Sequence, residues 1–474
     1  MLLQFSFSNF RSFRELQTLN FVAGNRDKSL PENCITPVLP GLTGKLSRWT
    51  KGAALYGANA SGKSTVLQAL RALRNLVLTS ARTTDPTEPI AQIVPFALDP
   101  AAATEPTAFA ISFIQDGMRY EYRVAATRER IRHESLRSFP TAQPVEWFTR
   151  DWSEETGAFV FGPEKPKTFA RDRPVEQRTL PNALHLSKLV AENHQQAAPV
   201  FRWFKERLHF FDLSAEGGFG GGFTTREFAE KTTNTSRMLE LLRNADIGVA
   251  SALVIEEEES FPDSNAFQPV ASRPMTESGA LLKALSEPHQ PQSLSGGEPE
   301  SPKKRKMFRV ELAHKGKAGK LQLFNWADES AGTRRLYSLA GPWLDILQKG
   351  RIVCIDELET SMHPLMVREL LRLFFSEKEN HNRAQILFTT HNPLLLDPTL
   401  IRRDQIWFTD KDNEGAAHLY PLTDYDPRQG ESLVRGYMSG RYGAVPFIPA
   451  GLLDGTFEAT GDGDAVETEN KEPA

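Results

Sequence analysis

The chain has 474 residues, of which 40% are hydrophobic and 24% charged, and its formal net charge is −4. This length is sufficient for two or three compact units with buried cores, and the small net charge provides no general attraction for nucleic acid or an anionic membrane. Two cysteines, Cys34 and Cys354, are too few for a disulfide framework or a cysteine-built zinc site. The opening MLLQFSFSNFRSF has the pattern of neither a signal peptide nor a transmembrane span, so we expect a cytoplasmic protein without membrane contact.

The first 80 residues predict a strand, a glycine-rich loop and a helix. Residues 3–7 alternate between apolar and polar as a half-buried strand does, and the apolar run 53–56 lies directly before a glycine-rich turn. From Val66 onward, apolar residues recur at helical spacing. Strand, loop and helix in this order are the context in which a phosphate-binding loop functions.

Two kinds of sheet are expected in the rest of the chain. Alternating runs at 109–113 and 118–124 flank Asp116-Gly117, a dipeptide that tolerates the positive φ angles of a tight hairpin turn. Antiparallel sheet is therefore expected after the first helix. The short apolar runs 351–355 and 385–388 are instead typical of buried parallel strands.

The middle of the chain changes character twice. Between residues 180 and 255, the stretches ALHLSKLVAENHQQ, VFRWFKERLHFF and SRMLELLRNADIG have helical character and predict a helical insertion. From residue 256, four glutamates are followed by polar and small residues up to the basic run 303–306. Such a segment buries too little apolar surface to offset its ordering entropy, which predicts disorder over 256–306. The acidic residues 454–474 predict a second disordered segment for the same reason.

The glycine-rich turn contains the pattern G-x-x-x-x-G-K-[ST]. In this pattern the glycines let backbone N–H groups point at phosphate, the helix dipole favours an anion, the lysine reaches the β- and γ-phosphates, and the following hydroxyl ligates Mg²⁺. The candidate nucleotide-binding residues here are Gly57, Asn59, Ala60, Ser61, Gly62, Lys63, Ser64 and Thr65.

A carboxylate pair follows the apolar run that ends at residue 355. Asp356 is the candidate ligand for Mg²⁺ together with Ser64, and Glu357 is the candidate group that polarises the attacking water. The next apolar run is followed by Thr389-Thr390-His391, where His391 is the candidate to hydrogen-bond the γ-phosphate and help position that water.

Together these motifs resemble the ATPase heads of the SMC, RecF and OLD group within the ABC superfamily. The long separation between the phosphate loop and the carboxylates also suits that group, whose members carry large insertions there. A nearer resemblance is to the stand-alone RloA-like ATPases of bacterial phage-defence and restriction-associated operons. The segments that resemble the SMC, RecF and OLD group are 9–13 after the opening strand, Asn59 in the phosphate loop, 356–357 with 360–364, and 389–393. The segments that resemble the RloA-like ATPases are 244–248 and 436–447.

This resemblance implies an α/β fold, namely an ABC-type P-loop ATPase head of mixed and parallel sheets flanked by helices, with an antiparallel β-lobe and a helical insertion. It also implies ATP and Mg²⁺ as ligands. The expected divisions are the N-terminal half of the head at 1–179, the helical insertion at 180–255, the disordered linker at 256–306, the C-terminal half of the head at 307–453 and the disordered acidic tail at 454–474.

In this group two heads meet face to face, and each ATP lies between one phosphate loop and the signature helix of the other copy. The resemblance therefore implies a homodimer or a higher homo-oligomer. Leu294-Ser295-Gly296-Gly297-Glu298 has the letters of the signature, but it lies in the least orderable segment, with Pro299 just beyond it, so no helix is expected to begin there.

We expect the signature at Ser330 and Gly332 instead, because the apolar pattern that follows predicts a helix whose N-terminus can face phosphate. Ala331, where the superfamily usually has glycine, is a departure from the pattern. By the same resemblance Arg11 and Asn9 lie near the nucleotide, although a structural role at a strand end is an equal alternative. Gln92 is a candidate for the glutamine that senses Mg²⁺.

Several other classes of protein fit less well. The chain lacks the Asn-Lys-x-Asp motif that reads guanine, the long heptads of a complete SMC protein, and room for a metal-binding Toprim domain after His391. Asp410 and Asp412 mimic an acidic pair but suit a hairpin turn, so no nuclease activity is expected.

Two function classes remain open. One is an ATP-hydrolysing sensor or scaffold that controls a separately encoded effector, a nuclease or toxin, in antiphage defence. The other is a DNA-repair or chromosome-associated clamp, for which nucleic acid would be bound by a basic face. That face would be drawn from Arg119, Arg123, Arg128, Arg130, Arg132 and Arg137, whose alternation is also typical of a solvated surface.

Overall fold

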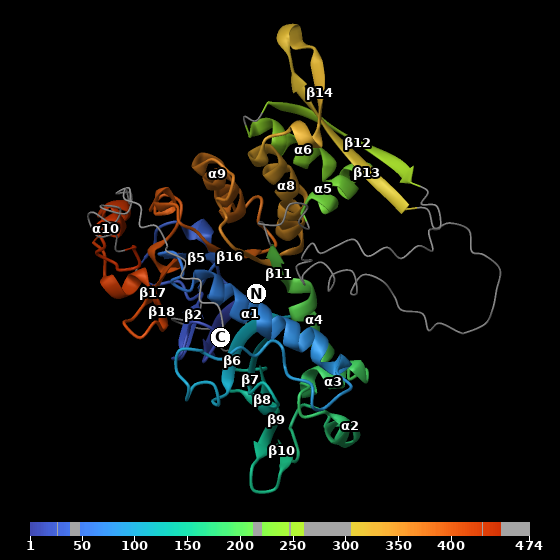
Figure 1. Cartoon of the computed structure of the whole chain (residues 1–474), viewed down its shortest axis with the longest axis vertical. Helices are drawn as coiled ribbons and strands as arrows, with labels where there is room; N and C mark the ends of the chain where they lie inside the picture. The colour runs from blue at the N-terminus through green and yellow to red at the C-terminus, as the bar shows by residue number, and fades with distance from the viewer. Residues whose placement is uncertain are drawn as a thin grey trace, which may run out of the picture. The chain divides into compact units, whose positions relative to one another are not determined.

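The chain divides into two units, shown with the whole chain in Figure 1. The first unit comprises residues 1–214 and 346–474, and the second comprises residues 215–345. The computed structural model describes residues 1–25, 27–37, 48–211, 220–245, 248–259, 305–428 and 430–446. Most of the segment expected to form a disordered linker and the whole of the acidic tail therefore lie outside the described residues.

A six-stranded sheet organises the first unit. Its strand order is β11-β15-β16-β5-β17-β18, and every neighbouring pair is parallel except β17 and β18. The apolar runs form the central strands, in which all residues of β5, β15 and β16 are buried. The bounds are Leu208–Phe211 for β11, Ile352–Ile355 for β15, Gln385–Thr389 for β16, Gly52–Gly57 for β5, Ile406–Lys411 for β17 and Ala417–Pro421 for β18.

Because β5, β15 and β16 are parallel, their carboxyl ends lie at one edge of the sheet. These ends carry the phosphate loop, the Asp-Glu pair and the Thr-Thr-His segment that the sequence singles out. Helix α1 (Lys63–Thr79) follows the loop directly, and α9 (Pro364–Phe375) follows the Asp-Glu segment. The predicted order of strand, loop and helix is confirmed.

A seven-stranded antiparallel sheet forms the second layer of this unit, with the order β10-β9-β8-β7-β6-β1-β2. The Asp116-Gly117 turn joins β6 to β7 with Gln115 opposite Met118, and both turn residues have positive φ (50° and 75°), as the sequence predicted. The bounds are Leu2–Ser8 for β1, Gln17–Asn20 for β2, Thr107–Gln115 for β6, Met118–Ala126 for β7, Ile131–Phe139 for β8, Val145–Ser153 for β9 and Ala158–Gly162 for β10.

Helix α1 shares one apolar core with both sheets. Its buried residues, among them Val66, Leu70 and Leu73, belong to the same cluster as Phe5 and Phe113 of the antiparallel sheet and strands of the central sheet. Figure 1 shows α1 between β5 and the antiparallel strands, which extend away from the central sheet. This packing fixes the helix whose first residue is Lys63, and therefore fixes the phosphate loop against both layers.

Short helices cover part of the antiparallel sheet. They are α2 (Arg173–Arg178), α3 (His185–Ala191), α4 (Ala198–Arg202) and a π-helical turn, η4 (Trp203–Arg207). The expectation of helix over 200–211 is wrong at its end, because Leu208–Phe211 pairs in parallel with β15 and becomes the edge strand β11 of the central sheet. That pairing partner lies about 140 residues later in the chain, where local periodicity cannot indicate it.

A buried ion pair ties α3 to the antiparallel sheet. Glu134 of β8 and Arg150 of β9 are both fully buried and lie 3.8 Å apart. The Glu134 carboxylate accepts hydrogen bonds from the Tyr122 hydroxyl (2.8 Å) and from the backbone N–H groups of His185 and Leu186 (2.6 and 2.9 Å). The Arg150 guanidinium donates to the carbonyls of Ala183, Leu180 and Thr179 and stacks on Phe159. We call this cluster the Glu134–Arg150 anchor.

The second unit contains a three-stranded antiparallel sheet, β12-β13-β14, with helices α5, α6 and α8. The predicted linker begins too early, because the four glutamates 256–259 continue β12 and pair with residues 305–308 of β13. This pairing is also non-local. The bounds are Gly220–Ala229 for α5, Thr235–Asn244 for α6, Val249–Glu259 for β12, Arg305–Lys315 for β13, Leu321–Asn325 for β14 and Ala331–Lys349 for α8, which ends in the first unit.

The remaining elements are short. Helix α10 (Leu433–Met438) contributes Tyr437, which packs with Tyr56 of β5 and Phe408 of β17. No helix of the described ranges is both long enough and apolar enough to cross a bilayer. The others are β3 (Cys34–Ile35) paired with β4 (Trp49–Thr50), and the 3₁₀ turns Pro31–Asn33, Ser80–Arg82, Lys317–Gly319, Trp326–Asp328, Pro393–Leu395, Arg403–Gln405 and Leu422–Tyr425.

Candidate nucleotide site

The phosphate loop connects β5 to α1 and depends on two glycines. Gly62, immediately before the helix, has φ +111°, and a Cβ there would lie 2.9 Å from the Phe13 ring. A Cβ on Gly57 would lie 2.5 Å from Ser61 Oγ and from the Thr409 carbonyl. Ser61 Oγ also hydrogen-bonds Thr409 Oγ1 at 2.6 Å, so β17 supports the loop from the neighbouring strand. Any side chain at either glycine would displace the loop.

Lys63 lies inside the loop that it follows. Its ammonium donates to the carbonyls of Gly57 and Ala58, both at 2.8 Å, and the side chain is 5% exposed. Burial lowers the pKa of Lys63 to about 8, opposed by the charges of Asp356, Glu357 and Glu359. Its two carbonyl partners lie at and just after the end of β5, the parallel neighbour of β16. Asn59 and Ala60 are exposed at the tip of the loop, and Ser64 and Thr65 are half-buried.

One hydroxyl joins the ends of β15 and β16. Thr389 Oγ1 donates to Asp356 Oδ1 at 2.6 Å and accepts the Glu357 N–H at 2.7 Å. Glu357 has an exposed side chain and φ +48°, a backbone conformation that is uncommon for residues other than glycine. A residue held in this conformation at a strand end is a recurrent feature of functional sites, and here it directs the carboxylate into the open edge of the sheet.

His391 follows β16 and lies among charged groups. Its backbone N–H donates to Glu359 Oε1 at 2.5 Å. Burial lowers the pKa of the His391 imidazole, and the Lys63 ammonium lowers it further, against the opposing charges of Glu359, Glu357 and Asp356. The structure therefore brings together Lys63, Asp356, Glu357 and His391, which are separated by up to 328 positions in the sequence. Sequence analysis missed Glu359 and Thr389, although Glu359 follows the Asp-Glu pair by only two residues.

Asn9 and Arg11, the two candidates in the segment after β1, lie in different environments. Asn9 is buried, and its side chain is fully engaged: Nδ2 donates to the Ala102 and Glu105 carbonyls, and Oδ1 accepts the Phe96 N–H. These three bonds support the structural alternative for Asn9, and its contact with nucleotide stays a prediction. Arg11 has an exposed side chain. The next residue, Ser12, donates to Thr65 Oγ1 at 3.3 Å, so the segment reaches helix α1.

The backbone N–H of Arg11 donates to the Val94 carbonyl at 2.8 Å. Gln92, two residues before Val94, is half-buried and remains a candidate only. Asp410 and Asp412 lie in the hairpin of β17 and β18, as expected. Asp410 accepts the Ala444 N–H, and Asp412 accepts N–H groups of its own turn and the His418 ring.

In the second unit, Ser330 caps helix α8. Its Oγ accepts the Thr333 N–H at 3.0 Å, and its carbonyl accepts the Arg334 N–H at 3.0 Å. The predicted helix start after Ser330 is confirmed, while the alternative serine, Ser295, lies outside the described residues. Ser330 and Ala331 are exposed and Gly332 is half-buried. The preceding Glu329 is buried and pairs with His314 at 2.7 Å, which fixes the turn before the helix.

The residues at the loop fit a magnesium ion bound together with nucleotide. Ser64 and Asp356 offer a hydroxyl and a carboxylate, and Mg²⁺ in nucleotide sites takes one or two such protein oxygens with phosphate oxygens and waters. The described residues contain no group of three or more His, Cys, Asp or Glu that could hold a metal by themselves.

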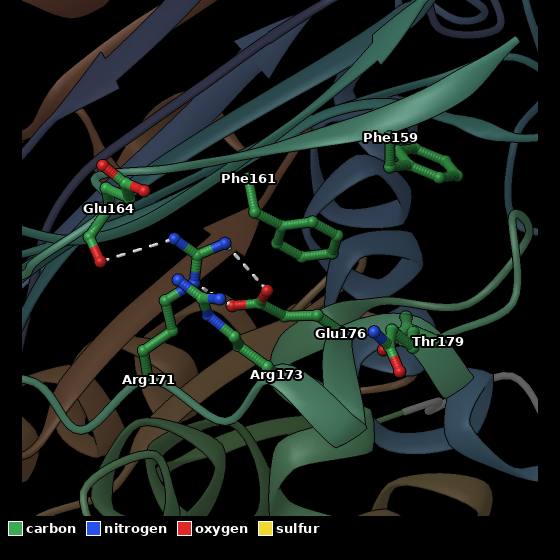
Figure 2. Close-up of a pocket in the computed structure, with 8 residues that line it drawn as sticks. Phe159, Phe161, Glu164, Arg171, Arg173, Glu176 and Thr179 are labelled. Carbon is green, nitrogen blue, oxygen red and sulfur yellow. Dashed lines mark hydrogen bonds and ion pairs between the residues drawn. The ribbon is translucent and has the colours of Figure 1, made fainter. Parts of the chain in front are cut away.

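A separate cleft of about 690 Å³ lies beside β10 and α2 (Figure 2). One of its two arginines is already paired, because Arg171 makes two hydrogen bonds to Glu176 at 2.6 and 2.9 Å. None of the nucleotide motifs contributes to it, so it is not the phosphate site. Its lining residues are Phe159, Phe161, Glu164, Arg171, Arg173, Glu176, Gln177 and Thr179.

Solved structures of similar proteins share low sequence identity with this chain. The SMC head domain from Thermotoga maritima is 12% identical, with 89% of this chain and 98% of that chain covered and a TM-score of 0.35. An SMC head bound to the C-winged helix domain of ScpA is 12% identical (88% and 96% covered, TM-score 0.37). The recombination mediator protein RecF with ATP is 13% identical (88% and 97% covered, TM-score 0.35).

Among curated proteins, none matches this sequence. A family model described as "AAA domain, putative AbiEii toxin, Type IV TA system" matches residues 53–397. The match begins in β5, includes the phosphate loop, the Asp-Glu pair and His391, and ends after the Thr-Thr-His segment. With most of its length covered in this way, the chain belongs to this AAA-domain family.

Proposed function

We propose that the protein hydrolyses ATP and acts as a sensor or scaffold that controls a separately encoded effector, a nuclease or toxin, in antiphage defence. The observation that carries the ATPase part is the convergence of Lys63, Asp356, Glu357 and His391 at the carboxyl ends of three parallel strands. A phosphate loop, a carboxylate pair and a third polar strand end are the parts that a phosphoryl-transfer site needs.

Each of these residues has a proposed task. Backbone N–H groups of the loop bind the phosphates, and the Lys63 ammonium exchanges its two carbonyl partners for β- and γ-phosphate oxygens. Asp356 and Ser64 hold Mg²⁺, which would neutralise developing charge on the phosphates. Glu357 accepts a hydrogen bond from the attacking water and polarises it, and His391 orients the γ-phosphate.

The other half of the site comes from a second copy in this proposal. Ser330 and Gly332 begin a 19-residue helix, and the exposed start of α8 can direct N–H groups and the Ser330 hydroxyl toward the γ-phosphate of the partner. ATP would then lie between two heads, and hydrolysis would need a homodimer or a larger homo-oligomer.

ATP turnover by the purified chain tests this function. Wild type should hydrolyse ATP, Lys63→Ala should abolish turnover, and Ser330→Arg should abolish both turnover and ATP-driven pairing. Ser295→Arg is the matched control for Ser330→Arg and should leave turnover and ATP-driven pairing almost unchanged. Equal turnover by wild type and Lys63→Ala would refute the ATPase, and loss of turnover in Ser295→Arg alone would refute the assignment of the signature.

The defence setting is a separate part of the proposal. It is supported by the family description, which names a toxin of a toxin–antitoxin system, and by the resemblance of the motifs to RloA-like ATPases. Cells that carry this gene with its neighbours should resist phage, and Lys63→Ala should remove the resistance. Unchanged phage titres with and without the gene would contradict this setting.

A DNA-associated clamp is the second candidate, because six arginines gather on β7, β8 and their turn. Much of this charge is already paired: Arg123 with Glu121, Arg132 with Glu154 and Arg137 with Glu146. Arg119 and Arg130 stack on Phe139 and Trp152. A salt-sensitive affinity for DNA that charge reversal at Arg128 and Arg132 removes would favour the clamp, and no binding at low salt would exclude it.

A further inference from the structure

Glu359 is a half-buried acid beside the site, and none of the nucleotide motifs includes it. It lies three residues after Asp356, in the segment between β15 and α9. One carboxylate oxygen, Oε1, accepts the backbone N–H of His391 at 2.5 Å. The other, Oε2, is buried and has no hydrogen-bond partner among the described residues. The carboxylate therefore makes one strong contact and keeps one acceptor unused.

The surroundings of Glu359 show how unusual this arrangement is. The Tyr56 hydroxyl, at the end of β5, is also buried without a hydrogen-bond partner among the described residues, and the charge of Glu359 adds to the burial that raises the pKa of Tyr56. An unpaired buried oxygen on a charged group destabilises a fold, because its lost hydration is not replaced. Glu359 is thus a poor choice for stability alone, in contrast to a residue whose polar atoms are all satisfied.

The single contact of Glu359 joins two segments of the site. Thr389 already links the end of β16 to Asp356 and Glu357 through its hydroxyl. The Thr389 carbonyl also accepts the Leu358 N–H at 3.1 Å, and the Thr390 N–H donates to the Leu55 carbonyl at 3.0 Å. Glu359 adds a further link at the peptide that carries the His391 side chain. Without the Glu359 link, the other bonds still hold residues 389 and 390, but the 390–391 peptide could rotate and turn the imidazole away.

We propose that Glu359 is a positioning residue for hydrolysis: its carboxylate holds the His391 backbone so that the imidazole faces the γ-phosphate. The proposal rests on the ATPase function given above. Glu359 acts through His391 and touches neither phosphate nor metal. Misplacing a catalytic group by a fraction of its hydrogen-bond length slows the chemical step, while substrate binding by the loop is little affected.

Kinetics of four full-length variants test this role: Glu359→Ala, Glu359→Gln, His391→Ala and the double variant Glu359→Ala/His391→Ala. Glu359→Ala should lower kcat about 10-fold or more while the KM for ATP stays within about 2-fold. Glu359→Gln keeps an acceptor for the His391 N–H and should recover most of the rate. The double variant should be no slower than His391→Ala, because both changes remove the same contribution.

Two outcomes would overturn the proposal: full activity of Glu359→Ala, or a double variant slower than His391→Ala by the factor that Glu359→Ala produces alone. A purely structural role makes a different prediction, namely a large loss of thermal stability. The positioning role predicts a melting temperature for Glu359→Ala equal to or above that of wild type, since an unpaired buried oxygen is removed.

Amide hydrogen exchange of residues 388–394 provides a readout that does not need ATP turnover. Glu359→Ala should speed exchange at His391 by about 10-fold or more, because the carboxylate that accepts that N–H is lost. If wild type does not hydrolyse ATP, the proposed function fails, and the exchange still decides whether Glu359 holds this segment. Unchanged exchange at His391 would overturn the inference by itself.

Discussion

Two regions of the first unit bury charged groups, and they use them in opposite ways. In the Glu134–Arg150 anchor, the carboxylate accepts three hydrogen bonds and the guanidinium donates to three carbonyls while it stacks on an aromatic ring. At the strand ends, Lys63 donates to two carbonyls, and within the described part of the chain one Glu359 oxygen has no partner. Among the described residues, the anchor leaves one buried polar atom, Arg150 Nε, without a partner, and its other charged atoms stabilise the fold through these contacts. The Lys63 ammonium keeps donor capacity that a phosphate can use.

The backbone shows the same difference. Around the nucleotide site, Ala60, Glu357 and Ser361 have φ angles of 60°, 48° and 59°, although none is glycine. Glu134 and Arg150 lie on regular strands with ordinary antiparallel partners. Left-handed conformations at non-glycine residues cost free energy and persist where function requires them. Variants in the anchor should therefore change stability without chemistry, and variants at the strand ends should do the reverse.

The largest expected effect on stability is that of Arg150→Met. It leaves the Glu134 carboxylate buried without its counter-charge, which should lower the free energy of unfolding by about 3–5 kcal/mol. ATP turnover per folded molecule should not change. Urea unfolding measures the difference against Arg132→Ala, a control in which an exposed pair with Glu154 is broken at a cost of at most about 1 kcal/mol. Equal losses in both variants would mean that the buried Glu134–Arg150 pair contributes no more to stability than the exposed Arg132–Glu154 pair.

The largest expected effect on chemistry is that of Glu357→Gln. The amide cannot polarise water as a carboxylate does, so kcat should fall by about 100-fold or more. ATP affinity and the unfolding midpoint should stay close to wild type, because the Glu357 side chain is exposed. Glu369→Gln on α9, which removes an exposed carboxylate next to Arg372, is the matched control. If Glu357→Gln lowered stability but kept its activity, Glu357 would behave as a residue of the anchor does, and the contrast between the two regions would be wrong.

The anchor and the nucleotide site also differ in how much of their structure the sequence predicts. Strand, loop and helix around Lys63, the Asp116-Gly117 hairpin and the helix after Ser330 follow from local patterns, which is why they are confirmed. Strand β11 and the strand character of residues 256–259 depend on partners far along the chain, and local composition indicated otherwise. The Glu134–Arg150 anchor and the Glu359 contact are side-chain pairings between segments, and no single-segment pattern encodes such pairings.

The pH dependence of ATP binding sharpens the comparison at Lys63. In the free protein burial lowers the pKa of Lys63 to about 8, and bound phosphates should raise it again. Above pH 8, ATP binding would then require Lys63 to take up a proton. The Kd for ATP should therefore be nearly constant up to about pH 7 and rise by up to about 10-fold per pH unit above 8. Lys63→Arg should bind more weakly but without this slope, since its guanidinium stays charged. A flat wild-type profile from pH 7 to 9 would show that Lys63 remains fully charged.

A smaller, mixed effect is expected for Thr389→Val, because this hydroxyl is both buried and part of the site. The change removes one bond to Asp356 and one from the Glu357 N–H at constant shape. We expect kcat to fall by about 10-fold and the free energy of unfolding to fall by about 1–2 kcal/mol. Thr399→Val, in an exposed turn with Asp397, is the control and should alter neither. Loss of stability alone would assign Thr389 to the fold rather than to the site.

The smallest effects on nucleotide binding and turnover are expected at Asn9 and Arg11, where a buried structural residue and an exposed one lie two positions apart. Asn9→Ala removes an amide with three satisfied bonds and should cost about 1–3 kcal/mol of stability without a change in ATP affinity per folded molecule. Arg11→Ala removes an exposed cation next to a segment that contacts α1, and should weaken ATP binding by only about 2- to 5-fold with no loss of stability. Titration of ATP onto both variants separates them. If Asn9→Ala weakened ATP binding and Arg11→Ala did not, the Asn9 amide would affect the nucleotide through the loop that it supports. A residue whose hydrogen bonds are all made within the protein would then also be functional. Hydrogen-bond satisfaction would no longer distinguish structural residues from functional ones in this protein.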